Sequence, residues 1–88
     1  HWRRLADAAK AGGFQRQRFG ALSVLSDEAY RGDDIDAVEK IEREALADAR
    51  GWGNRPEEAA SLYGLALGAN ASGRPDDAEQ HFREAIAI

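Results

Sequence analysis

Apolar residues recur at steps of three and four along most of the chain, which is the spacing of one face of an α-helix. Glycine- and proline-containing breaks divide this pattern into five segments, at about residues 2–10, 15–31, 34–49, 56–71 and 75–86. No alternating strand pattern and no long linker separates them. The pattern predicts an all-α fold of about five helices, in which short loops make consecutive helices antiparallel.

The second half of the chain repeats the first. Leu22, Leu25 and Ala29 recur as Leu62, Leu65 and Ala69, at a constant offset of 40 in residue number. Gly32 and Gly73 are separated by an offset of 41, and the string Leu5-Ala6-Asp7-Ala8 recurs at the same offset in 46–49. A two-helix unit repeated at this period predicts stacked helical hairpins. We therefore divide the chain into half a repeat at 1–13 and two whole repeats at 14–53 and 54–88.

Helix ends and buried faces follow from local sequence. Asp33 or Asp34 is suited to cap the third helix, and Pro56 and Pro75 suit the first turns of the fourth and fifth. We expect residues 50–55 to form a linker, because glycines flank a tryptophan there. The expected buried positions are Ile35, Val38, Ile41, Ala45, Leu46 and Ala49 on the third helix, Ala59, Leu62, Leu65, Ala66 and Ala69 on the fourth, and Ala78, Phe82, Ala85 and Ile86 on the fifth.

These repeats resemble tetratricopeptide repeats (TPRs). The later copy has the family's residue types at Leu62, Leu65, Ala66, Ala69, Gly73, Ala78, Phe82 and Ala85. In the earlier copy Leu22, Leu25, Ser26, Ala29 and Ala45 fit, but Ala37 and Ala45 are eight apart where Ala78 and Ala85 are seven, and Ile41 replaces the aromatic residue. The period exceeds the usual ~34 residues. The added residues around 50–54 resemble the long-linker variety found in bacterial regulators and LGN/Pins-type scaffolds.

The resemblance implies a right-handed superhelix of antiparallel hairpins whose first helices line a concave groove. We expect that groove to be lined by Ser23, Asp27, Tyr30 and Arg31 in one repeat and by Ala60, Tyr63, Leu67, Asn70 and Ala71 in the other. Two tyrosines, an amide and charges suit peptide binding. Each tyrosine could equally cover a neighbouring side chain. The family's Lys-and-Asn clamp for a terminal carboxylate does not occur at these positions.

The rest of the chemistry points away from catalysis. The 88-residue chain has a net charge of −4, no cysteine and only two histidines, His1 and His81. The acidic trio Asp33, Asp34 and Asp36 lacks the spacing of a calcium loop, and no serine lies in a nucleophile motif. We expect no catalytic residue, metal site or cofactor. Gly64-x-x-x-Gly68 indicates instead that a neighbouring helix or a ligand approaches the fourth helix closely.

Three functions remain as hypotheses. The first is a protein–protein interaction module within a bacterial scaffold or transcription regulator, since the Ala, Arg, Gly and Asp content resembles a high-GC genome. The second is a ligand- or peptide-sensing domain of a transcription regulator, which a pocket closed by Tyr30, Tyr63 and Trp52 would favour over an open groove. The third is nucleic-acid binding through the basic residues Arg3, Arg4, Lys10, Arg16 and Arg18 and the aromatic residues among them, although the acidity of the remaining chain weighs against it.

The ends of the sequence add a further expectation. The chain has no methionine and stops within an apolar helical stretch, as expected of a piece of a longer cytoplasmic protein. Phe82, Ala85, Ile86 and Ile88 would then meet further repeats, or self-associate through the terminal helix. No segment is long and apolar enough to suggest a membrane partner.

Overall fold

The computed structural model describes all 88 residues and contains five helices and no strand. The helices are α1 (Trp2–Gly12), α2 (Gln15–Arg31), α3 (Ile35–Trp52), α4 (Arg55–Ala71) and α5 (Pro75–Ile86). The predicted all-α class and the number of helices are confirmed. None of the helices combines the length with the apolar character required to cross a membrane.

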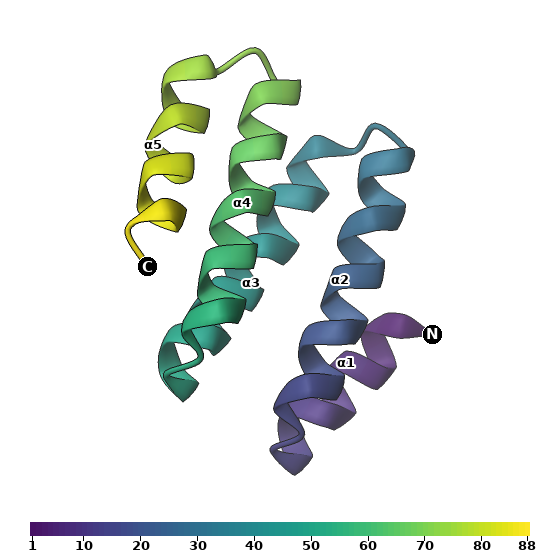
Figure 1. Cartoon of the computed structure of the whole chain (residues 1–88). Helices are drawn as coiled ribbons and strands as arrows, with labels where there is room; N and C mark the ends of the chain where they lie inside the picture. Colours follow the sequence, from purple (N-terminus) through teal and green to yellow (C-terminus); the bar gives the residue numbers. More distant parts are fainter.

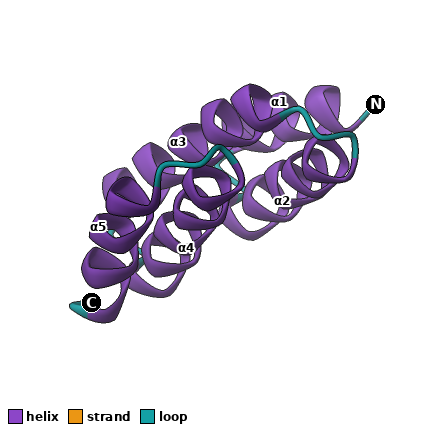
Figure 2. Ribbon diagram, turned by 90° about the horizontal axis from the view of Figure 1, so that it is seen from above, coloured by secondary structure: helices purple, strands orange, loops and turns teal.

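The helices lie in two layers. Helices α1, α3 and α5 form one layer, and α2 and α4 form the other (Figure 2). Helices consecutive in the chain make the main contacts, so α3 packs against both α2 and α4 (Figure 1). The Cα atoms span 37 × 30 × 12 Å, and in so thin a molecule only 18 of the 88 residues are buried.

The turns between the helices repeat with a single period of 40 in residue number. Helices α2 and α4 begin and end at this offset, and the left-handed glycines Gly13 and Gly53, with φ of 75° and 68°, have the same separation. The expected correspondence of Gly32 with Gly73 is wrong. Asp33, with a φ of 61°, takes the left-handed position that Gly73 occupies in the next repeat, whereas Gly32 has a φ of −83°.

The connection between α3 and α4 is shorter than the predicted linker. Helix α3 continues through Trp52, so that only Gly53 and Asn54 separate the two helices. The N–H of Asn54 donates to the carbonyl of Ala49 at 2.8 Å, and its side-chain Oδ1 accepts from the N–H of Glu57 at 3.1 Å. One residue thus closes α3 and caps α4. Asp34 caps α3 in the same way, accepting from Ala37 at 3.2 Å.

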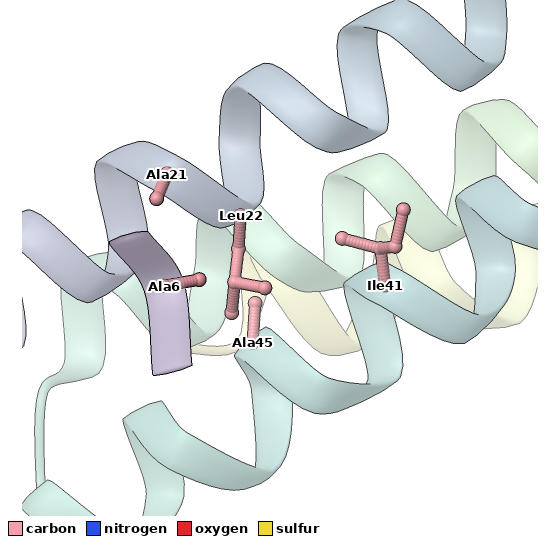
Figure 3. Close-up of a cluster of buried hydrophobic side chains, with 5 residues drawn as sticks. All are labelled: Ala6, Ala21, Leu22, Ile41 and Ala45. Atoms are coloured by element: carbon pink, nitrogen blue, oxygen red, sulfur yellow. The ribbon is translucent and has the colours of Figure 1, made fainter. Parts of the chain in front are cut away.

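The core consists of small and branched residues between the two layers. Figure 3 shows a cluster of Ala6, Ala21, Leu22, Ile41 and Ala45, and a second cluster contains Leu46, Leu62 and Leu65. Ala6 meets Leu22 as Leu46 meets Leu62, so Ala6, and not Leu5, corresponds to Leu46. The alignment of Leu5-Ala6-Asp7-Ala8 with residues 46–49 is therefore wrong by one position.

The observed period also corrects the predicted buried faces. Val38, 2% exposed, takes in α3 the place that Ala78, 3% exposed, takes in α5. Ala37, which the sequence aligned with Ala78, is only half-buried. At the chain's end Ile86 is 85% exposed and does not belong to the buried face of α5, while Phe82 and Ala85 are half-buried.

Candidate functional site

A small hollow lies between α2 and α4, with α3 as its floor. Its volume is about 180 Å³, and it is lined by Ser26, Asp27, Tyr30, Val38, Glu42, Gly64 and Leu67. The glycines of α4 make this geometry possible. The carboxylate of Glu42 occupies the space that a Cβ on Gly64 would need, and Glu39 and Val38 lie close to Gly68. The prediction that Gly64-x-x-x-Gly68 admits a neighbouring helix is therefore confirmed, and that helix is α3.

Glu42 is the main charged group on the floor of the hollow. Ser26 Oγ donates a hydrogen bond to Glu42 Oε2 at 2.8 Å. Burial raises the pKa of the Glu42 carboxyl, and the nearby charge of Asp27 raises it further, while the Ser26 hydrogen bond lowers it. The lining contains two carboxylates and no basic side chain, so the hollow is electrostatically negative.

The structure gathers three of the nine predicted groove residues, namely Asp27, Tyr30 and Leu67, while Ala60 and Ala71 are exposed outside the lining. Ser23 is half-buried on α2, and Arg31 and Asn70 are exposed outside the lining. Tyr63 lies against Phe82 of α5 instead, with ring centroids 5.4 Å apart in an edge-to-face arrangement. The binding role of the nine residues stays a prediction. A pocket closed by Tyr30, Tyr63 and Trp52, which would favour ligand sensing over an open groove, does not form, because only Tyr30 lines the hollow.

Sequence reasoning missed the α3 side of the hollow because it assigned the wrong register to that helix. In the observed period Glu42 corresponds to Phe82, whereas the sequence placed Ile41 at the aromatic position. Ile41 is 8% exposed and packs with Leu22 in the core. The glutamate thus replaces the aromatic residue. The offset between Leu22 and Leu62, applied to α3 as well, would have identified it.

A second, larger hollow lies between α1 and α2. Its volume is about 480 Å³, and it is lined by Trp2, Leu5, Ala8, Ala9, Phe14, Gln17, Gly20 and Ala21. Leu5 and Phe14 are 44% and 60% exposed, and Trp2 is 39% exposed. Trp2 and Phe14 are two of the aromatic residues that the nucleic-acid hypothesis included. They form an open apolar surface near the N-terminus.

Three of the five basic residues considered for nucleic-acid binding, Arg3, Lys10 and Arg18, form internal ion pairs. Arg18 is 2% exposed, and its Nε lies 2.7 Å from Asp48 Oδ2. Arg3 forms two hydrogen bonds of 2.8 Å to Glu44, which together with Arg18 lower the pKa of that carboxyl, and Lys10 lies 3.3 Å from Asp48. This pairing ties α1 and α2 to α3. It leaves only Arg4 and Arg16 of the five outside these ion pairs, which reduces the positive charge available to a nucleic-acid backbone.

The remaining titratable groups do not form a candidate metal site. No group of three or more His, Cys, Asp or Glu side chains is arranged to hold a metal ion. His81 Nδ1 lies 3.7 Å from Glu84 Oε1 of its own helix. Comparison with protein-family models, with curated proteins and with solved structures finds no match to this chain.

Proposed function

We propose that this chain is a protein–protein interaction module of the tetratricopeptide type, which holds an extended segment of a partner in the hollow between α2 and α4. The constant offset between the helices of successive repeats and the two-layer arrangement, with α2 and α4 on the same side, support this proposal. The hollow is open to solvent, as a segment of chain would require. The module would act within a larger cytoplasmic scaffold or regulator of bacterial type.

The observation that carries the proposal is the chemistry of the lining. Glu42 and Asp27 supply negative charge, while Tyr30 and Leu67 supply an aromatic and an aliphatic wall. A lysine or arginine side chain of the partner fits this combination, because its stem can lie along the apolar wall while its head reaches the carboxylates. The half-buried position of Glu42 strengthens such a pair relative to one in open solvent.

The size of the hollow favours a peptide side chain over a small-molecule signal. Small-molecule sites are typically about 300–1,000 Å³ and enclose most of the ligand, whereas this hollow has a volume of about 180 Å³. The ligand-sensing hypothesis, which places its pocket beside Tyr30, would need a larger cavity at this position. The internal pairing of Arg3, Lys10 and Arg18 likewise weighs against the nucleic-acid hypothesis.

Selection from a displayed library of random peptides tests the proposal. We expect enrichment of peptides with one Lys or Arg flanked by apolar residues, and binding by the free peptides that weakens at higher salt. Glu42→Gln and Tyr30→Ala should each reduce affinity about ten-fold, the equivalent of roughly 1.4 kcal/mol. Glu28→Gln is the matched control, because Glu28 is exposed on α2 outside the hollow. Selection of acidic peptides, or equal effects of Glu28→Gln and Glu42→Gln, would refute the proposal.

A further inference from the structure

The apolar hollow between α1 and α2 has a counterpart inside the molecule that shows what covers such a surface. Because one offset relates successive repeats, α1 and α2 correspond to α3 and α4. The α1 residues Trp2, Leu5 and Ala8 of the hollow therefore correspond to Glu42, Ala45 and Asp48 of α3. The structure shows which residues surround Glu42, Ala45 and Asp48.

Helix α2 covers all three counterpart residues. Ser26 of α2 donates a hydrogen bond to Glu42 at 2.8 Å. Leu22 packs against Ala45 in the core cluster (Figure 3). Arg18 donates to Asp48 at 2.7 Å. One helix of 17 residues thus occupies, on α3, the position that stands open on α1.

The chemistry of the open site differs from that of its covered counterpart. The two carboxylates of α3 are replaced by Trp2 and Ala8, and the capping residue Asn54 is replaced by Phe14. A helix with the charges of α2 would leave its arginine without a partner there, at a substantial desolvation cost. A helix with apolar residues at those positions would cover Trp2 and Leu5 and remove exposed apolar area from water.

From this correspondence we infer that the hollow between α1 and α2 is a docking site for an amphipathic helix of a partner protein. That helix lies as α2 lies on α3, over a length of about 25 Å for a helix as long as α2, and it presents apolar side chains where α2 has Arg18 and Ser26. The site is separate from the hollow between α2 and α4 and does not depend on the function proposed for it.

Two peptides derived from α2 test the inference against the intact chain. The first peptide is residues 15–31 unchanged, and the second carries Arg18→Leu and Ser26→Leu. We expect the second peptide to bind at least ten-fold more tightly. In NMR titration it should shift the indole N–H signal of Trp2 and leave that of Trp52 in place, because Trp52 lies on α3 outside the hollow.

Substitutions in the chain complete the test. Leu5→Asp should weaken binding of the second peptide at least ten-fold, whereas Ile86→Asp, at an exposed apolar residue of the opposite end, should not change it. Ala8→Asp restores the carboxylate that Asp48 provides on α3, so it should reverse the preference and favour the peptide that retains Arg18. Ala8 is exposed, and this variant should fold normally.

Two outcomes would overturn the inference. One is the absence of a Trp2 shift with either peptide in the intact chain and in the Ala8→Asp variant. The other is a dimer of the chain, detected by sedimentation, that covers Trp2 and is not displaced by the second peptide. The second outcome would identify another copy as the occupant.

Discussion

The helix triplet α1–α3 buries an arginine where the triplet α3–α5 places a glutamate. Arg18 of α2 is 2% exposed and is surrounded by Asp7, Glu44 and Asp48. At the corresponding position of the next repeat, Glu58 of α4 lies 3.0 Å from Arg50 of α3, and the side chain of Arg50 is 52% exposed. The same position of the repeat therefore carries opposite charge. The charged side chain is buried in one triplet and belongs to a solvent-accessible ion pair in the other.

The apolar contacts differ in a complementary way. Ala6 meets Leu22 in the N-terminal triplet, whereas Leu46 meets Leu62 in the C-terminal one. Leu46 is larger than its counterpart Ala6, while the N-terminal triplet has ion pairs along the same interface. The same arrangement of the helices accommodates both kinds of contact, because the left-handed turns at Gly13, Asp33, Gly53 and Gly73 are placed alike in both triplets.

The largest difference between the triplets should appear when the central charge is removed. Arg18→Ala leaves the half-buried carboxylates of Asp48 and Glu44 with only one cation each, Lys10 and Arg3. We expect a loss of about 3 kcal/mol in the free energy of unfolding, as for other broken buried pairs. Urea denaturation monitored by circular dichroism measures this.

Glu58→Ala provides the comparison in the other triplet. Its partner Arg50 is half-exposed and can be solvated, so we expect a cost of less than about 1 kcal/mol. Equal losses for Arg18→Ala and Glu58→Ala would show that burial does not distinguish the two triplets.

A second comparison concerns the small residue at the start of α5. Ala78 is 3% exposed and faces α4, and the corresponding Val38 in α3 is 2% exposed. We expect Ala78→Leu to cost about 2 kcal/mol by overpacking, and Ala78→Val to cost less because valine already fits this position in the other triplet. Ala71→Leu, at an exposed site, is the control. A melting temperature that Ala78→Leu leaves unchanged would contradict this packing.

The sequence predicts the helices well because their signals are local. The bounds of α2 and the cap of α3 depend on residues adjacent in the chain; the bounds were predicted, and the cap was narrowed to Asp33 or Asp34, of which the structure has Asp34. The register of α3 depends instead on whether Gly32 or Asp33 turns left-handed. Glycine has the stronger preference for that conformation, so the sequence favoured Gly32. The resulting error of one position misplaced Ala37 and prevented Glu42 from being identified as part of the hollow.

The hollow between α1 and α2 and the buried Arg18 could not be predicted for a different reason. Arginine is rarely buried, and a helical arginine is normally assigned to solvent. Its burial depends on Glu44 and Asp48, which lie on another helix and become neighbours only after packing. The exposure of Trp2 and Phe14 likewise reflects which helix lies beside α1, and periodicity within one helix contains no information about its neighbours.

The turns before α3 and α5 allow a smaller effect to be measured. Gly73, with a φ of 73°, occupies the position of Asp33, with a φ of 61°. We expect Gly73→Ala to cost about 1 kcal/mol, because a Cβ is unfavourable in this conformation. Asp33→Gly should change stability by less than about 0.5 kcal/mol, because aspartate tolerates the conformation and glycine adds unfolded-state entropy. Thermal denaturation of both variants and of Gly51→Ala, a helical control with open space around it, measures the difference.

The smallest expected effect concerns the floor of the hollow, where Glu42 stands in the place of Phe82. Burial raises the folded-state pKa of Glu42 above its unfolded value, so the stability linked to this group is fully present below about pH 4. That stability declines as pH rises through the folded-state pKa. Glu42→Gln keeps an acceptor for Ser26 without the charge. It should therefore stabilise the chain by about 0.5 kcal/mol at pH 7.5 and leave stability unchanged at pH 3.5.

For Glu44, on the same helix, we expect the opposite dependence of stability on pH. Its hydrogen bonds with Arg3 lower its pKa, so its contribution is present above the unfolded pKa and is lost as pH falls through the folded-state value. Glu44→Gln should destabilise the chain at pH 7.5, and this cost should fade on acidification. Urea denaturation of both variants at the two pH values separates the groups. A destabilising Glu42→Gln at pH 7.5 would mean that the charge on the floor of the hollow is already compensated, and a basic side chain from a partner would then gain little there.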